Sequence, residues 1–277
     1  MKPVAAIETV DLFPPLSREL LGVLKALQPT DWDRPTACGD WTVRDVAAHL
    51  LGGNLGRLQE PASPDSRSNE PILGYDELLG LINRGNAEWV LAARRISPRL
   101  LIEFLELTDP LVYAHFKALN PHAPARITVA WASDQIPPNW FDIAREYTER
   151  WLHQQHIREA VGLPILNGRA WLHPVLDTFL RGLPRAFRGL EAGPGSLVYI
   201  QMTGPAGGEW TLVPEDDRWV LFAGSAPRPA CRVSLDADLA WRLFTKGVTP
   251  QEARTRVRIE GDTRLGEQVL QLVSIMA

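Results

Sequence analysis

The sequence predicts a helical bundle followed by a smaller antiparallel α+β domain. In the N-terminal part, apolar residues recur every three or four positions, as in amphipathic helices. In the C-terminal part, short apolar runs alternate with turns rich in Gly, Pro and Asp, as in strands. The chain has 277 residues, of which 45% are hydrophobic and 22% charged. This composition allows one large domain or two ordinary ones with packed cores, and it excludes a disordered chain.

The charge balance and the lack of long apolar runs exclude two classes of partner. The chain carries 29 basic and 33 acidic side chains, and it has no block of Lys and Arg. Nucleic-acid binding normally needs clustered positive charge, so we expect no nucleic-acid partner. No run approaches the ~18 apolar residues of a membrane-spanning helix, and the N-terminus has no apolar signal core. We therefore expect a cytoplasmic protein, monomeric or homodimeric, that acts on a small molecule away from membranes.

The two cysteines, Cys38 and Cys231, lie far apart, and neither belongs to a C-x-x-C pair. The sequence therefore does not support a thiolate zinc centre or a dithiol redox centre. A disulfide between them stays open, but in a cytoplasmic chain we expect two reduced thiols. We do not expect Cys38 to serve as a metal ligand.

Several segments of the N-terminal part have the pattern of amphipathic helices. These are residues 14–26, 43–58, 75–95 and 140–160, with a weaker pattern at 97–119. Thr42 is expected to cap the second helix, with Asp45 reaching back to it in a capping box, and Asn139 to cap the last. A loop rich in Pro, Ser and Asp is expected at residues 61–71, and a short extended piece at 127–131. This order of helices predicts a bundle.

The C-terminal part combines helices and strands. Helices are expected at residues 171–190, 236–245 and 263–275, and strands at residues 197–200, 210–213, 219–222 and 231–235. The glycines within residues 204–208 lack the patterns of phosphate-binding loops, so we interpret them as a hairpin turn between two strands.

One predicted helix carries the residues with the clearest chemical potential. Glu149 and His153 are four residues apart and project from one helix face, with His156 adjacent to it. Such a pair supplies two ligands of a metal site that needs a third, and His49 on another helix is the natural candidate. Three ligands of this type leave a position for water or substrate, which is typical of catalytic metal sites. The alternative is a surface ion pair or a core histidine, since E-x-x-x-H pairs are common on helices.

Two segments resemble a known family. Residues 41–50, WTVRDVAAHL, resemble a signature of the DinB-like mycothiol-dependent maleylpyruvate isomerase family, and the segment from Glu149 to Arg158 resembles its second signature. The tail, including IEGD at 259–262, is similar to the sterol-carrier-like C-terminal domain of those proteins. The resemblance implies a metal-binding four-helix bundle over residues 1–168 and a sterol-carrier-like α+β domain over residues 169–277 that starts with a bridging helix.

The resemblance also implies ligands and an activity. It implies a divalent metal held by His49, Glu149 and His153, with zinc as the expected ion and nickel or manganese as alternatives. It further implies a low-molecular-weight thiol such as mycothiol, and hence an isomerase or S-transferase acting on an electrophilic small molecule.

One residue departs from the family pattern, because His156 stands where many relatives have aspartate. As a candidate catalytic residue it can be an alternative ligand, a support for another ligand or a proton shuttle, and we favour the supporting role. Two other functions stay open for the chain. One is a metal hydrolase that uses metal-bound hydroxide with the same ligands, and the other is a non-enzymatic carrier of apolar ligands.

Overall fold

The computed structural model describes residues 1–59, 75–126, 129–193, 195–216 and 218–274. The chain forms two compact units. The helical unit comprises Thr9–Asn120 and Glu149–Ile165, and the sheet unit comprises Met1–Glu8, Pro121–Thr148 and Leu166–Ile275. The division expected at residue 168 stays a prediction, because these units are not continuous along the chain.

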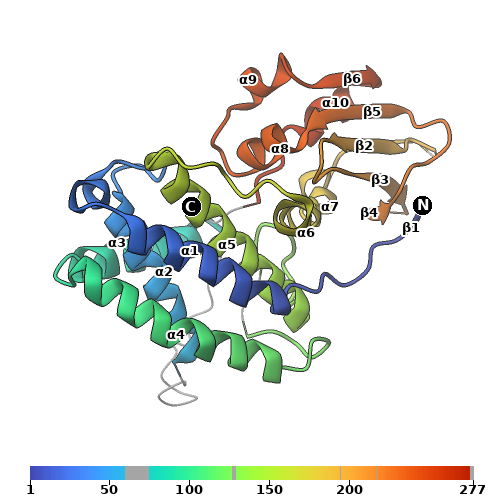
Figure 1. Ribbon diagram of the computed structural model, residues 1–277. Coiled ribbons are helices and arrows are strands. Elements are labelled where there is room, and N and C mark those ends of the chain that lie inside the picture. Colours follow the sequence, from blue (N-terminus) through green and yellow to red (C-terminus); the bar gives the residue numbers. More distant parts are fainter. Residues whose placement is uncertain (60–74, 127–128, 194, 217, 275–277) are drawn as a thin grey trace. The chain divides into compact units, whose positions relative to one another are not determined.

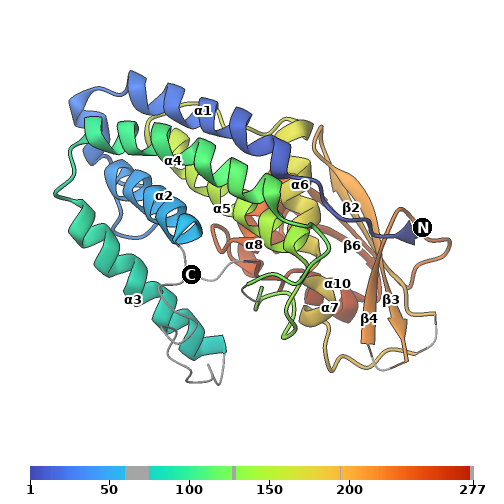
Figure 2. The same cartoon turned by 90° about the horizontal axis from the view of Figure 1, so that it is seen from below.

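The helical unit consists mainly of long helices. They are α1 (Phe13–Ala26), α2 (Val43–Leu58), α3 (Tyr75–Ala93), α4 (Pro98–Ala118) and the second half of α5 (Asn139–Ala160). Helix α2 packs against α3 and α4, and α1 packs along α4 (Figure 1 and Figure 2). The buried side chains form one core, which includes Leu20, Leu24, Val43, Val46, Ala47, Leu50, Leu51, Leu101, Leu105 and Ile157. All the helices expected in this part of the sequence are present.

Local signals explain where these helices begin. Helix α2 starts at the capping box formed by Thr42 and Asp45, as expected. Ser97 caps α4, with proline in its first turn. Asn139 is the first residue of α5 rather than its cap. The Pro138 carbonyl already accepts hydrogen bonds from the Phe141 and Asp142 N–H groups, so the helix begins one residue earlier than expected.

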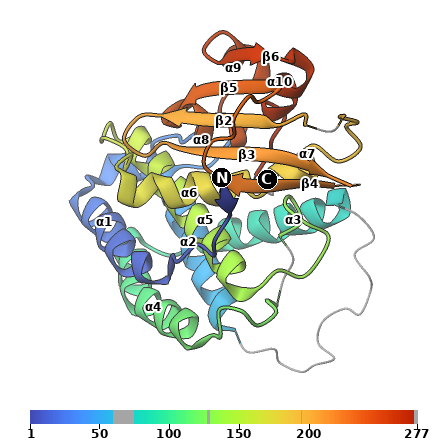
Figure 3. The ribbon, with the colours of Figure 1, turned by 90° about the vertical axis from the view of Figure 1, so that its right-hand side faces the viewer.

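The sheet unit contains one mixed sheet. Its strands are β1 (Lys2–Pro3), β2 (Val198–Thr203), β3 (Gly208–Glu215), β4 (Arg218–Ala223), β5 (Cys231–Asp236) and β6 (Arg258–Gly261). They lie in the order β1-β4-β3-β2-β5-β6. The helices are α6 (Arg169–Leu180), α7 (Leu183–Ala186), α8 (Ala237–Phe244), α9 (Pro250–Arg254) and α10 (Thr263–Val269). Helices α6, α7 and α8 lie behind the sheet in Figure 3. The prediction of an α+β region is confirmed.

The expectation of a purely antiparallel sheet is wrong, because β2 and β5 are parallel. In the sheet, β3 and β2 separate β4 from β5, so the chain crosses over between these strands instead of turning back in a hairpin. Alternation of apolar residues sets the buried face of a strand but not its direction. The hairpin turn between β2 and β3 is confirmed. A Cβ atom on Gly207 would lie 2.1 Å from the Met202 carbonyl oxygen, so only glycine fits there.

Other expectations for the connections need correction. The helix expected at residues 171–190 is two helices, α6 and α7, and the helix expected to reach residue 275 ends at Val269. The extended piece at 127–131 is not formed at residues 129–131, which lead into a turn. Residues 127–128, residue 275 and the loop at 61–71 lie outside the described residues. Within the described part of the chain, no helix is long and apolar enough to span a membrane.

Candidate metal centre

The first turn of α2 fixes the position of His49. The Thr42 hydroxyl accepts a hydrogen bond from the Asp45 backbone N–H, and the Thr42 N–H donates to the Asp45 carboxylate at 3.1 Å. Asp45 also accepts two hydrogen bonds from the Arg94 guanidinium, at 2.9 and 3.0 Å. One turn further along α2, the ring of His49 lies against that of Trp41, with centroids 5.0 Å apart. The cap therefore orients the helix turn that presents His49.

His49, Glu149 and His153 come together within the helical unit. The Nε2 atoms of His49 and His153 lie 2.9 and 3.0 Å from the same carboxylate oxygen, Oε1 of Glu149. The neighbouring arginines do not pair with Glu149, because Arg145 pairs with Asp142 and Glu146. Arg150 pairs with Asp109. The side chains of His49 and His153 are 12% and 13% exposed and that of Glu149 is 34% exposed, so the triad of His49, Glu149 and His153 is partly buried.

Electrostatics keep Glu149 ionised. Burial alone would raise the pKa of its carboxyl group. The positive charge of His153 and hydrogen bonds from His153 and His49 outweigh burial and hold the pKa well below its usual range. A carboxylate only accepts hydrogen bonds, so in this arrangement each histidine donates from Nε2. The site thus combines one fixed negative charge with two imidazole nitrogens.

This donor set fits a divalent cation. The donor atoms of His49, Glu149 and His153 all lie within 4.8 Å of one another. Two imidazole nitrogens and a carboxylate oxygen are ligands that zinc prefers in catalytic sites, where a fourth position stays open. The structure therefore brings together the three residues expected as ligands, and their role as ligands stays a prediction.

His156 does not join the triad formed by His49, Glu149 and His153. It faces Cys38 instead. Its Nδ1 atom lies 2.8 Å from the Cys38 Sγ atom, and Nδ1 of His153 lies 3.6 Å from the same sulfur. Both cysteines of the chain are free thiols, as expected. Burial raises the pKa of the Cys38 thiol to about 11. The sequence does not predict that Cys38 lies beside His156, because Cys38 belongs to no periodic pattern of a helix or strand.

A tight turn presents Cys38 to α5. The Thr36 hydroxyl donates to the Trp41 carbonyl at 2.7 Å and accepts from the Cys38 N–H at 3.2 Å. The Trp41 N–H donates back to the Cys38 carbonyl at 3.1 Å. Gly39 has φ +60°, in the left-handed region that favours glycine. A glycine directly after Cys38 was the signal in the sequence that marked this turn.

Replacing Gly39 with alanine is expected to lower the free energy of unfolding by about 1 kcal/mol. The loss is conformational, because an added Cβ atom would meet no atom within 4 Å. Gly22 is the matched control: it is exposed on α1 and equally open, but its backbone is helical. Gly22→Ala should raise stability by up to about 1 kcal/mol. Urea unfolding of both variants tests this, and a Gly39→Ala protein as stable as the parent would contradict it.

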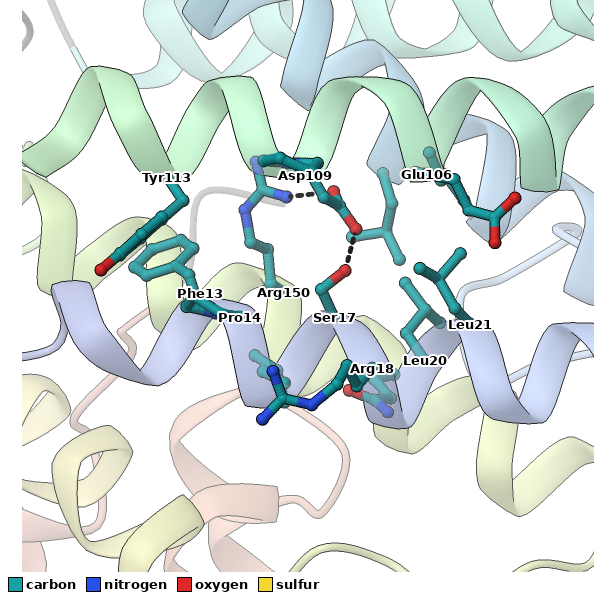
Figure 4. A pocket seen from close by; sticks show the side chains of 15 residues that line it. Phe13, Pro14, Ser17, Arg18, Leu20, Leu21, Glu106, Asp109, Tyr113 and Arg150 are labelled. Carbon is teal, nitrogen blue, oxygen red and sulfur yellow. Dashed lines mark hydrogen bonds and ion pairs between the residues drawn. The ribbon is translucent and has the colours of Figure 1, made fainter.

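A cavity of about 430 Å³ lies on another face of α5. Arg150 and Gln154 line it. Arg150 directly follows Glu149 and Gln154 directly follows His153, so each side chain is turned by about 100° around the helix axis from a residue of the triad. Its walls are largely apolar side chains of α1 and α4, and Asp109 lies between Ser17 and Arg150 (Figure 4). The Asp109 carboxylate accepts hydrogen bonds from Ser17 and, at 2.7 Å, from Asn54. No residue of the triad lines this cavity, so it is separate from the candidate metal centre.

Comparisons with solved structures support the fold. A crystal structure of a variant of mycothiol-dependent maleylpyruvate isomerase matches 94% of this chain and 96% of its own, with a TM-score of 0.53 at 11% identity. A second structure of the isomerase matches 88% of this chain and 91% of its own, with a TM-score of 0.46 at 11% identity. A UbiJ-SCP2 ubiquinone synthesis protein matches 39% of this chain and 89% of its own, with a TM-score of 0.26 at 19% identity. At identities this low the similarity concerns the fold alone. It rests on the structure with the TM-score of 0.53 and not on the two with lower scores.

Sequence comparison gives the family. No curated protein matches the chain. The family described as the mycothiol maleylpyruvate isomerase N-terminal domain matches residues 13–158, which include all three residues of the triad. This confirms the resemblance carried by residues 41–50 and by the Glu149 segment. Because the match spans more than half of the chain, the protein belongs to the mycothiol maleylpyruvate isomerase family of enzymes.

Proposed function

We propose that this protein is a metal-dependent enzyme that uses a low-molecular-weight thiol, such as mycothiol, on an electrophilic small molecule. Its reaction is cis–trans isomerisation, as in maleylpyruvate isomerase, or transfer of the thiol to the substrate. The observation that carries the proposal is the convergence of two histidine Nε2 atoms on one oxygen of Glu149, at 2.9 and 3.0 Å. Family membership supports the thiol.

The residues of the triad would hold the cation, with zinc as the expected ion and nickel or manganese as alternatives. When bound, zinc lowers the pKa of a thiol enough to give the thiolate near neutral pH. Glu149 contributes the negative charge that favours a cation, and with the cation bound His49 and His153 would contribute neutral nitrogen donors. The protein supplies three donors here, which leaves room for a thiol. Trp41 packs against the His49 ring, with ring centroids 5.0 Å apart.

The fate of the thiol adduct distinguishes the two reactions. A thiolate that adds to an electron-poor double bond leaves a single bond, with the electron pair delocalised into the neighbouring carbonyl group. Rotation about this bond, followed by loss of the thiolate, restores the double bond in the other geometry without net gain of a proton. If the adduct takes a proton from solvent before the sulfur leaves, the thiol stays attached. Isomerisation therefore requires that proton delivery be slower than bond rotation and loss of the thiolate together.

Metal content tests the site directly. We expect close to one zinc ion per chain after reconstitution and desalting, because three donors converge at one place. The His49→Ala/His153→Ala variant should lose most of this zinc. Elemental analysis of both proteins, with circular dichroism to confirm folding, measures the difference. Unchanged zinc in a folded double variant would contradict the proposed site.

The thiol requirement tests the activity. With maleylpyruvate and mycothiol we expect isomerisation that stops when the thiol is omitted and that the double variant does not catalyse. Turnover of an ester or amide without thiol would instead support the hydrolase alternative, in which metal-bound hydroxide attacks. Absence of any thiol-dependent reaction in zinc-loaded protein would contradict the proposed function while leaving the metal site in place.

A further inference from the structure

The ring of His153 faces a different set of donors at each nitrogen. Its Nε2 atom lies 3.0 Å from Glu149 Oε1, on the side of the triad. Its Nδ1 atom lies 3.6 Å from Cys38 Sγ, and Nδ1 of His156 is 2.8 Å from the same sulfur. The donor atoms of Cys38, His153 and His156 also lie within 4.8 Å of one another. The triad with Glu149 therefore accounts for only one side of this ring.

We propose that Cys38, His153 and His156 form a second cation seat, the thiolate seat, for a thiophilic ion such as Zn²⁺ or Cd²⁺. Thiolate and imidazole are ligands that soft and borderline cations prefer. In a tetrahedral zinc site with ordinary bond lengths, a sulfur and a nitrogen ligand lie about 3.6 Å apart, which is the observed separation of Cys38 Sγ and His153 Nδ1. The contact with His156 has hydrogen-bond length, and it would lengthen by somewhat under ~1 Å on ion binding.

The surroundings already support His153 as a ligand through Nδ1. A histidine that binds a metal through one nitrogen usually donates its other N–H to a carboxylate, which fixes the ring. Glu149 accepts from Nε2 of His153 in this way. The turn at residues 36–41 holds Cys38 in place through hydrogen bonds of its own. The thiolate seat is therefore built from fixed groups on α5 and on a closed turn.

The two seats are alternatives. A neutral imidazole has one nitrogen lone pair and one N–H, so His153 binds one ion at a time. An ion in the triad uses Nε2 and leaves the Nδ1 hydrogen facing Cys38, whereas an ion in the thiolate seat uses Nδ1. Thiophilic cations would thus withdraw His153 from the triad.

Cadmium titration tests the thiolate seat. We expect the ultraviolet charge-transfer band of a cadmium–thiolate bond to grow to about one equivalent in the parent protein and in His49→Ala, which breaks only the triad. Cys38→Ser should abolish the band, and His156→Gln should weaken cadmium binding at least ~10-fold. Cys231→Ser is the matched control, since it removes the other thiol of the chain, and the band should persist.

Three outcomes would overturn the inference. One is no band in either the parent or His49→Ala, and another is a band that survives in Cys38→Ser. The third is a band that is lost in folded His49→Ala, because Cys38 would then be an additional ligand of the triad. Thermal unfolding of each variant confirms that it is folded. Zinc binding by Cys38→Ser reports on the triad alone, so failure of the thiolate seat is distinguishable from failure of the proposed function.

Discussion

Replacing Glu149 with glutamine is expected to lower zinc affinity and thiol-dependent turnover together, each by at least ~10–100-fold. The Glu149 carboxylate, which both histidines contact through one oxygen, would become a neutral amide. The site would therefore lose its one fixed negative charge. Changes outside the coordination sphere of a metal already cost this much, and Glu149 is proposed as a ligand itself. The two losses should be parallel because they have one cause.

The measurement is zinc competition with a chelator alongside steady-state assays, both in the Cys38→Ser background so that no thiolate competes for the ion. Glu103→Gln is the control, since Glu103 lies on α4 in an exposed pair with Arg99 at 2.6 Å. Exposed pairs of this kind contribute about 0–1 kcal/mol, so neither zinc affinity nor turnover should change. Normal zinc affinity and normal turnover in Glu149→Gln would require the metal-enzyme proposal to be withdrawn.

Asp45→Ala is expected to lower the free energy of unfolding by roughly 2–4 kcal/mol. Asp45 is 2% exposed, yet its carboxylate accepts two hydrogen bonds from Arg94 and one from the Thr42 N–H. Its removal leaves the first turn of α2 without half of its capping box. Glu252→Ala is the control, because Glu252 forms the equivalent capping box with Thr249 in an exposed position, and its loss should be smaller. Urea unfolding at neutral pH measures both.

The effect of Asp45 should also depend on pH. Burial alone would raise the pKa of Asp45, but hydrogen bonds from Arg94 and Thr42 outweigh burial and lower it. A lowered pKa in the folded state gives stability that is fully present above the unfolded value, about 3.9, and is lost as the pH falls through the folded value. The difference between parent and Asp45→Ala should therefore shrink below about pH 4. A constant difference from pH 7 to pH 3 would contradict this assignment.

The helical unit was predictable because its signals are local. The capping box of Thr42 and Asp45 and the apolar stripe that follows define α2 within one residue, and the spacing of Glu149 and His153 sets their common face. The meeting of His49 with Glu149 is a contact between two helices, which the sequence predicts only through the need for a third ligand. The apolar stripe of α2 and the common face of Glu149 and His153 were predictable because residues three or four apart lie on the same face of a helix.

The contacts that the sequence does not predict depend on turns and crossovers. Cys38 reaches α5 because Gly39 adopts a left-handed conformation and the turn closes on Trp41. No period in the sequence relates Cys38 to His156. The parallel pairing of β2 with β5 depends on the path of residues 224–230, whereas the alternation of apolar residues would be the same in either direction.

The pairing of β1 with β4 has a consequence for folding during synthesis. Lys2 and Pro3 pair with Ala223 and Phe222, so β1 must wait for a strand that is made more than two hundred residues later. The described segments of the helical unit are complete once residue 165 has been made. Since domains generally fold as units in the order of their synthesis, the helical unit should fold first. Until β4 has been made, β1 has no strand to pair with. The edge of β4 is then covered only when β1 pairs with it.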